Sequence, residues 1–200
     1  MKKDLALLVA DKNMDFAMRG ILSRPESLGI RRVDYQTFAS GTDGGVRTAG
    51  HATLGLLRNQ FHHGLMMFDR EGSGAEATDP LELEQQSDDQ LRKLWGDRAK
   101  AIVLVPEVDV WMWGSDNALS RIVGWTGTEG IRVWLRQQGF EFDGNEKPVR
   151  PKEAMECLMK EVRKPRSSRL YEEIIKAISL RNCVDPSFHR LRAVLRAWFP

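Results

Sequence analysis

Acidic residues follow three short apolar runs of this chain, at the point where each run stops. The runs cover residues 5–10, 64–68 and 101–106. The acids that follow them are, in the same order, Asp11, then Asp69 and Glu71, then Glu107 and Asp109. Apolar runs of this kind, separated by helical patterns, predict parallel strands that are buried on both faces. Because parallel sheets bind ligands at the carboxyl ends of their strands, we expect these carboxylates at one edge of one sheet.

Five carboxylates at one edge repel one another unless something offsets their charge. Two unit charges about 5 Å apart, at an effective dielectric constant of about 20, repel by roughly 3 kcal/mol. Such a cluster needs a shared proton, a basic partner or a divalent cation. A hard cation, Mg²⁺ or Mn²⁺, is the simplest of these three, and it is the cofactor that the sequence predicts.

The length and composition indicate a soluble α/β protein of ordinary size. The 200 residues are 42% hydrophobic and 29% charged, and no window approaches the roughly 18 uninterrupted apolar residues that a membrane span needs. The N-terminus has a basic start without a long apolar segment or a small-residue cleavage site, so we expect a cytoplasmic protein that does not engage a membrane. Two cysteines, Cys157 and Cys183, fit a reducing compartment as free thiols.

Alternating strand and helix patterns predict the order β-α-β-α-β-α-β. A first helix capped by Asn13 or Asp15 follows the first strand, and Pro25 ends it. The other expected elements before residue 114 are a strand at 30–38, a glycine-rich loop at 41–50, a helix at 51–61, a helix that starts at Asp79-Pro80, and an extended segment at 107–113. This order favours a three-layer fold with helices on both faces of a parallel sheet.

The chain beyond residue 114 reads as helical. Short helices are predicted at 115–123 and 130–138, a polar connection at 140–151, and further helices from Pro151, from Arg169 and from Asp185-Pro186-Ser187. We place a boundary near residue 145, with an α/β domain over residues 1–145 and a C-terminal helical extension over residues 146–200 that packs on it. The extension carries a net charge of +6 and the rest of the chain −4, so the basic part is a candidate surface for a polyanion.

Asp69-Arg70-Glu71-Gly72 is the sharpest motif. Two acids one residue apart at the end of a strand point the same way if the backbone stays extended, so both can reach one cation. Glu107 and Asp109 stand in the same relation to the next strand, and alternation there places Trp111 and Trp113 on the side of the acids. Tryptophans in this position are more often core or domain-packing residues than platforms on which nucleic-acid bases stack. The predicted metal ligands are Asp69, Glu71, Glu107 and Asp109.

A basic stretch lies in the C-terminal part of the chain. Its residues suit contacts to phosphates that do not depend on base sequence, or to the acidic surface of a protein partner. The candidate nucleic-acid-binding residues are Lys147, Arg150, Lys152, Arg163, Lys164, Arg166 and Arg169. The sequence lacks the ending of a P-loop, the zinc-ligand spacing of Cys and His, and the Gly-x-Ser-x-Gly turn of a serine hydrolase.

These motifs, in this order, resemble an uncharacterised bacterial family of Toprim-like proteins associated with phage-defence loci. The resemblance rests on Asp11, on Asp69 to Gly72, on Glu107 to Trp111 with Asp116, and on Asp185-Pro186-Ser187-Phe188. It spans nearly the whole chain and implies a Toprim-like sheet. Toprim domains of topoisomerases, primases and nucleases use a Glu after the first strand as general acid/base and an Asp-x-Asp pair for magnesium.

By this resemblance Asp11 is the general acid/base, and Asp69 and Glu71 complete the catalytic set as magnesium ligands. The chain departs from the Toprim pattern because Asp11 replaces a Glu and Glu71 replaces an Asp. The predicted function is Mg²⁺-dependent hydrolysis of DNA or RNA in antiphage defence, with partners that include nucleic acid and other defence-system proteins such as an ATPase. The alternative is a catalytically degenerate Toprim-like subunit that binds other proteins of a defence complex.

Overall fold

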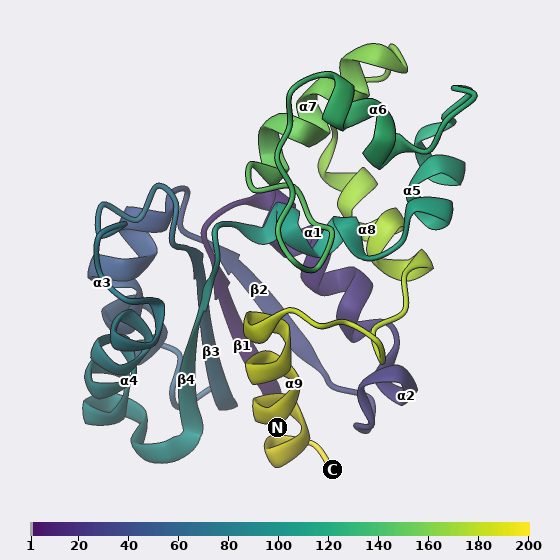
Figure 1. Ribbon diagram of the computed structural model, residues 1–200. Helices are drawn as coiled ribbons and strands as arrows, with labels where there is room; N and C mark the ends of the chain where they lie inside the picture. The colour runs from purple at the N-terminus through teal and green to yellow at the C-terminus, as the bar shows by residue number, and fades with distance from the viewer. Residues whose placement is uncertain (1) are drawn as a thin grey trace.

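Four parallel strands form one sheet in the order β2-β1-β3-β4 (Figure 1). The computed structural model describes residues 2–200. The strands are β1 (Lys3–Val9), β2 (Tyr35–Ala39), β3 (Phe61–Asp69) and β4 (Ala99–Leu104). Val9 of β1 pairs in register with Met67 of β3, and Asp69 pairs with Leu104 of β4. The carboxyl ends of β1, β3 and β4 therefore meet at the same edge of the sheet, as the apolar runs predict.

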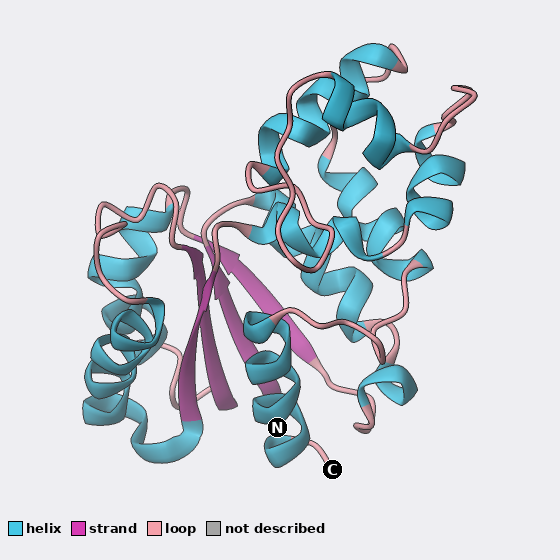
Figure 2. Cartoon of the chain, viewed as in Figure 1, coloured by secondary structure: helices cyan, strands magenta, loops and turns pink. Residues whose placement is uncertain are grey.

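Helices cover both faces of the sheet, so the prediction of a three-layer α/β fold is confirmed. Helices α3 (Asp43–Gly55) and α4 (Pro80–Trp95) pack on one face, and α1 (Lys12–Leu22) and α9 (Pro186–Trp198) pack on the other (Figure 2). The central strands are continuous apolar runs because both faces are covered: Leu65 to Phe68 of β3 have no exposed surface. Two short helices, α2 (Pro25–Leu28) and the 3₁₀ helix η1 (Gly96–Arg98), connect larger elements.

The chain between β4 and α9 forms a separate group of helices beyond the carboxyl ends of the strands (Figure 1). The group comprises the 3₁₀ segment η2 (Val108–Gly114), α5 (Asp116–Val123), α6 (Ile131–Gln137), α7 (Pro151–Glu161) and α8 (Ser168–Ala177). We call these elements the helical group. Helix α8 packs along α1 and joins the group to the sheet layers. The helical group begins at residue 108, well before the predicted boundary at 145, and that boundary stays a prediction.

Two helix starts differ from the sequence prediction because side chains cap them earlier. Asp11 itself caps α1, since its Oδ1 accepts a hydrogen bond from the Met14 N–H at 2.9 Å. Thr42 caps α3 through the Gly45 N–H at 3.1 Å, so the prediction of a loop over residues 41–50 was wrong. The helix expected over residues 51–61 ends at Gly55, and the second strand begins at Tyr35 rather than at residue 30.

The segment after β4 is a 3₁₀ helix, so the expected extended strand over residues 107–113 was also wrong. Strand alternation would bury every second residue, but all six residues from Val108 to Trp113 are buried. The two indoles lie in the core and their N–H groups are satisfied there. Trp111 Nε1 donates to Asp185 Oδ1 at 3.1 Å, and Trp113 Nε1 donates to the Pro151 carbonyl at 3.3 Å. The core interpretation of both tryptophans is confirmed.

Side chains from α4 and α9 close the free edge of β4. Glu84 Oε1 accepts the Val103 N–H at 3.0 Å, and Asp88 Oδ1 accepts the Ala101 N–H at 2.8 Å. Arg190 of α9 donates to the Val103 carbonyl at 3.1 Å and to both carboxylate oxygens of Glu84 at 2.8 and 2.9 Å. These contacts occupy backbone groups that another strand would otherwise pair with.

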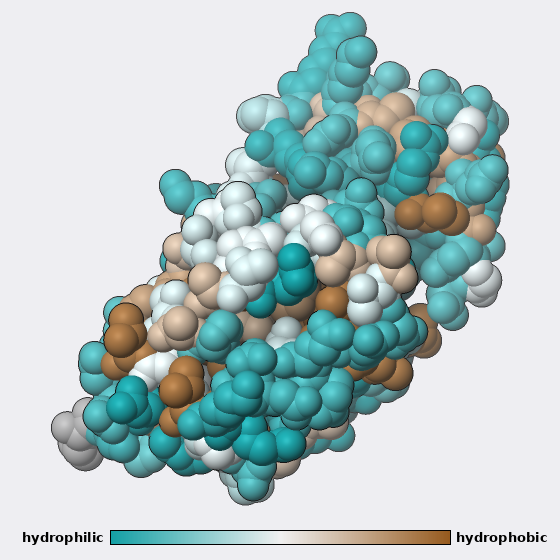
Figure 3. All heavy atoms as spheres, turned by 90° about the vertical axis from the view of Figure 1, so that its left-hand side faces the viewer, coloured by the Kyte–Doolittle hydropathy of each residue, from teal (hydrophilic) through white to brown (hydrophobic). Residues whose placement is uncertain are grey.

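The face formed by α3 and α4 is largely hydrophilic, with separate hydrophobic spots (Figure 3). Over the whole described surface the exposed large hydrophobic residues are Leu56, Leu81, Leu94, Val133, Val149 and Val184. Within residues 2–200, none of the helices has the length and apolar character needed to cross a membrane.

Replacement of Arg190 by Met tests how much the closed edge of β4 contributes to stability. The variant leaves the carboxylate of Glu84, which is 12% exposed, without its cation. We expect the free energy of unfolding to fall by about 2 kcal/mol in urea titrations, less than for a fully buried pair because Arg190 is partly exposed. Arg169→Met removes an exposed pair with Glu173 and is the control, with an expected loss under about 0.5 kcal/mol. An equal decrease in the free energy of unfolding in the two variants would contradict a stabilising role of Arg190 at the edge of β4.

Candidate functional site

Three carboxylates lie where the chain leaves the carboxyl edge of the sheet. Asp11 follows β1 as the N-cap of α1, Asp69 is the last residue of β3, and Asp43 is the first residue of α3, after β2. The backbone N–H of Asp69 donates to Asp43 Oδ1 at 2.7 Å. Asp43 is therefore fixed against the end of β3 by its own side chain.

Two further carboxylates come from the chain after β4. The Val108 N–H donates to Asp69 Oδ1 at 2.9 Å, which joins the start of η2 to the end of β3. Glu107 and Asp109, on either side of Val108, are 8% and 2% exposed. We call Asp11, Asp43, Asp69, Glu107 and Asp109 the acidic cluster.

Four carboxyl groups of the acidic cluster have raised pKa values because they are withdrawn from water and lie near other carboxylates, namely Asp43, Asp69, Glu107 and Asp109. Burial raises the pKa of Asp69 well above its usual value, and the charges of Asp43, Glu107 and Asp109 raise it further. Burial, followed by the charge of Asp109, raises the pKa of Glu107 to about 7. Burial also raises the pKa of Asp43 and of Asp109, and the charge of Asp11 adds to both shifts. The five groups therefore act on one another electrostatically.

The helical group supplies the groups that offset this charge. Asp109 Oδ1 accepts hydrogen bonds from Arg166 and from the Tyr171 hydroxyl, both at 2.9 Å. Glu107 Oε1 accepts the Lys152 N–H at the start of α7, at 3.1 Å. The positive charge of Lys152 lowers the pKa values of Asp43, Glu107 and Asp109, against the effect of burial. Among the described residues Asp69 accepts a hydrogen bond only from a backbone N–H and forms no ion pair.

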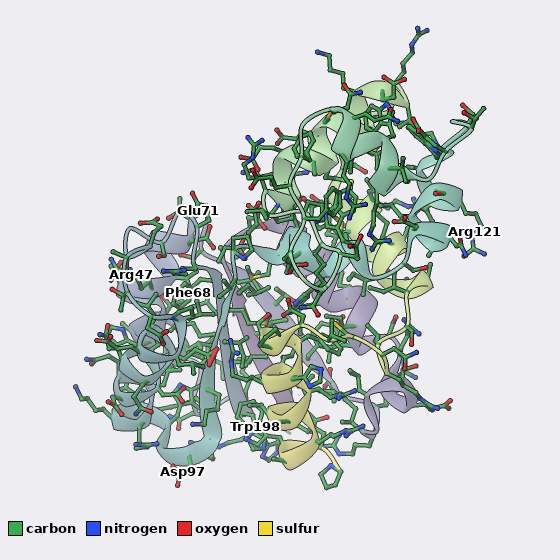
Figure 4. All side chains as sticks on the ribbon, viewed as in Figure 1. Arg47, Phe68, Glu71, Asp97, Arg121 and Trp198 are labelled. Carbon is green, nitrogen blue, oxygen red and sulfur yellow. The ribbon has the colours of Figure 1, made fainter. Side chains whose placement is uncertain are left out.

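Glu71 lies at the same edge but outside these contacts. Its side chain is exposed, and Figure 4 shows it at the tip of the turn above the sheet. Its backbone N–H donates to the Pro106 carbonyl at 3.0 Å, and Gly72 and Gly74 after it adopt left-handed conformations with φ of 80° and 72°. These glycines turn the chain back directly after Glu71. Its role as a metal ligand stays a prediction.

The predicted nucleic-acid-binding residues divide into two sets. Lys147 is 5% exposed and pairs with Asp185 at 3.4 Å, and Arg166 pairs with Asp109 and with Glu156 at 2.9 Å each. A phosphate contact by either residue would require an internal pair to open. The other five have exposed side chains, namely Arg150, Lys152, Arg163, Lys164 and Arg169.

The acidic cluster is not a preformed metal centre. Within residues 2–200, no three or more His, Cys, Asp or Glu side chains are already grouped so that they could hold a metal ion. Asp109 is bound to Arg166 and Tyr171, and Asp11 is partly engaged as a helix cap. Coordination of a cation by several of these carboxylates would therefore need side-chain rotation.

Sequence reasoning did not identify two members of the site. Asp43 also follows a strand, so the rule that selected Asp11 and Asp69 applies to it, but the prediction of a glycine-rich loop over residues 41–50 concealed it. Tyr171 is separated from Asp109 by 62 positions, and only the tertiary fold brings them together. Arg121, on α5, points away from the sheet and does not serve the cluster (Figure 4).

Comparison of the chain with protein-family models, with curated proteins and with solved structures found no match.

The raised pKa of Glu107 predicts how stability depends on pH. Its pKa rises from the ordinary 4.5 to about 7 on folding, so the stabilising effect of its protonated form is present below about pH 4.5 and is lost as the pH rises to about 7. Gln at this position stays neutral and keeps the oxygen that accepts the Lys152 N–H. We expect Glu107→Gln to be more stable than the parent above pH 7 and equally stable at pH 4.5, as measured by urea unfolding across this range.

Glu141→Gln is the control for this experiment because the side chain of Glu141 is exposed. It should follow the parent at every pH. A stability difference between the parent and Glu107→Gln that does not change from pH 4.5 to pH 8 would contradict the predicted protonation of Glu107.

Proposed function

We propose that this protein hydrolyses phosphodiester bonds of nucleic acid at the acidic cluster, with Mg²⁺ or Mn²⁺ as cofactor. The observation that carries the proposal is the environment of Asp69. Its carboxyl group is surrounded by Asp43, Glu107 and Asp109, and it has a single backbone N–H as partner. A site that concentrates carboxylates without a basic partner at its centre favours a divalent cation.

The donor set fits a hard cation. All the side chains of the acidic cluster offer oxygen, the donor that Mg²⁺ and Mn²⁺ prefer, and nitrogen or sulfur ligands are not among them. Asp69, Glu107 and Asp43 would hold the cation, with Glu71 as a further ligand from the exposed turn. A cation bound there supplies stabilisation of negative charge on phosphoryl oxygens and lowers the pKa of a bound water.

The chain's own residues have separate tasks in this proposal. Asp11 is the exposed member of the cluster, and its Oδ1 caps α1, which leaves Oδ2 to accept or return a proton. Lys152 and the start of α7 bring positive charge to the cluster, where a phosphate oxygen carries negative charge. The exposed Arg163, Lys164 and Arg169 contact the phosphates of the nucleic-acid strand, and these contacts do not depend on the base sequence. The resemblance to Toprim-like proteins of phage-defence loci extends the proposal to antiphage defence.

A second candidate function is that of a catalytically degenerate Toprim-like subunit that binds other proteins of a defence complex. The contacts of Asp109 favour it. Arg166 neutralises this carboxylate and Tyr171 donates to the same oxygen, which is how a fold stabilises a buried charge that no longer serves catalysis. In this case the exposed basic residues of α7 and α8 contact an acidic protein surface.

Asp69→Asn tests the first candidate directly. The change keeps the shape of the side chain and removes its charge, so we expect Mg²⁺-dependent cleavage of single- or double-stranded DNA or RNA to be abolished. A substrate panel with Mg²⁺, Mn²⁺ or chelator measures this. Asp97→Asn is the control, because Asp97 is 95% exposed and lies at the opposite end of the sheet layers from Glu71 (Figure 4). Cleavage by Asp69→Asn at the parental rate would place the activity elsewhere.

Binding of the cation should also be visible without any substrate. At Mg²⁺ about 100-fold above its dissociation constant the parent should gain about 2.7 kcal/mol of stability, and Asp69→Asn should gain much less. In metal-free buffer we expect Asp69→Asn to unfold at a higher temperature than the parent, because the variant lacks the repulsion between Asp69 and the neighbouring carboxylates. Thermal unfolding with and without Mg²⁺ measures both effects. Equal stabilisation of the two proteins by Mg²⁺ would exclude Asp69 as a ligand.

Replacement of Arg163, Lys164 and Arg169 by Ala separates the two candidate functions. Loss of three phosphate contacts should flatten the slope of log affinity against log salt by about 2 to 3 units, with similar effects for all nucleic-acid sequences. The matched control replaces three exposed basic residues at the other end of the sheet, Arg92, Lys93 and Arg98. For a protein-binding subunit we expect weak nucleic-acid binding in the parent, no change in the variant, and loss of co-purifying partner proteins.

A further inference from the structure

A pocket of about 530 Å³ opens at the carboxyl end of β4, and none of the residues that line it belongs to the acidic cluster. Three parts of the chain surround it: the residues that follow β4, the connection before α7, and the start of α9, with the start of α4 at its rim. Figure 1 shows two of these segments, the end of β4 and the first turn of α9. Its volume is that of a site for a small organic molecule.

The walls of the pocket are mainly apolar. They are formed by Leu81, Val105, Pro106, Val110, Pro148, Val149 and Pro186. Leu81 and Val149 are 58% and 52% exposed, so apolar side chains also border the opening. Apolar walls with a small number of polar groups are characteristic of ligand sites.

Lys147 provides a buried hydrogen-bond donor in this wall. Its side chain is 6% exposed, yet within residues 2–200 its ammonium group has one hydrogen-bond partner, Asp185 Oδ2, at 3.4 Å. Lys147 contacts Oδ2 of Asp185, whereas Trp111, Ser187 and the Phe188 N–H donate to Oδ1. The other N–H donors of the Lys147 ammonium group therefore have no acceptor among the described residues. A buried donor without an acceptor favours a ligand that supplies an acceptor oxygen.

The charges around the pocket disfavour an anionic ligand. Three carboxylates line it, from Asp79, Asp143 and Asp185, against two cationic groups, from Lys147 and Arg190. Arg190 is already paired with Glu84 outside the pocket. A bound carboxylate or phosphate would be repelled more than attracted, whereas a carbonyl oxygen can accept from Lys147 without added negative charge.

We propose that this pocket is a binding site for an uncharged small molecule with an apolar body and a carbonyl oxygen, which accepts a hydrogen bond from Lys147. The apolar body lies against Val105, Val110 and Pro148. The proposal does not depend on the nuclease function, because none of the pocket residues belongs to the acidic cluster.

Two uncharged fluorescent probes test the pocket in the full chain. Nile red has an apolar polycyclic body with a carbonyl oxygen, and pyrene is a hydrocarbon without an acceptor. We expect saturable binding of one Nile red per chain. Val149→Trp places an indole at the opening and should weaken binding of both probes at least ten-fold. Leu56→Trp is the control. Leu56 is the C-cap of α3 and is 78% exposed, so the same indole is added away from the pocket and should not change the binding of either probe.

Lys147→Met tests the hydrogen bond itself. Loss of a donor with a charge should weaken Nile red binding by about ten-fold or more and leave pyrene binding unchanged. Circular dichroism and thermal unfolding establish that this variant is folded, and Val149→Trp provides an independent test because the residue is exposed. Nile red affinity that is the same in the parent and in Val149→Trp would overturn the pocket as the binding site. Equal weakening of pyrene and Nile red by Lys147→Met would overturn the role of Lys147.

Discussion

Repulsion among the carboxylates at the carboxyl edge is the constraint on which the arrangement of the C-terminal half depends. The parallel register brings the ends of β1, β3 and β4 together, and the acids that follow these strands come with them. Each offsetting contact then comes from a later part of the chain. Arg166 and Tyr171 bind Asp109, and the first turn of α7 donates to Glu107. The helical group is thus attached to the sheet through the acidic cluster as well as through apolar contacts.

In the proposed function, this arrangement links folding and cation binding at one place. A protein that neutralised every carboxylate with arginine would be more stable without metal, but it would have no charge left to hold a cation. Here Asp109 has an arginine and a tyrosine, whereas Asp69 has one backbone N–H. In the proposed function, this difference between two neighbouring carboxylates separates a structural part of the cluster from the part that would bind the cation.

The sequence was sufficient to predict the sheet, because parallel strands buried on both faces produce apolar runs that are recognisable without knowledge of their neighbours. It also identified the caps at Asp79 and Asp185, since capping is a local interaction. It failed at α3, where Thr42 and a buried Val46 outweigh the low helix propensity of Gly44 and Gly45. It failed again at η2, where consecutive residues are all buried and the alternation of buried and exposed residues that a strand would show is absent. The partners of Asp109 are distant in sequence, so no local pattern indicates them.

The segments that lead into and out of the helical group lie next to each other. Val105 and Pro106, after β4, line the same pocket as Asp185 and Pro186, at the start of α9. Helix α9 then packs on the sheet beside β4. Topologically, the helical group is an insertion between two elements of the α/β layers, and its entry and exit line the same pocket. The parts of this insertion that do not contact α1 or the acidic cluster can consequently vary in size and sequence without displacement of any strand, which makes them well suited to evolve new specificity on an unchanged sheet.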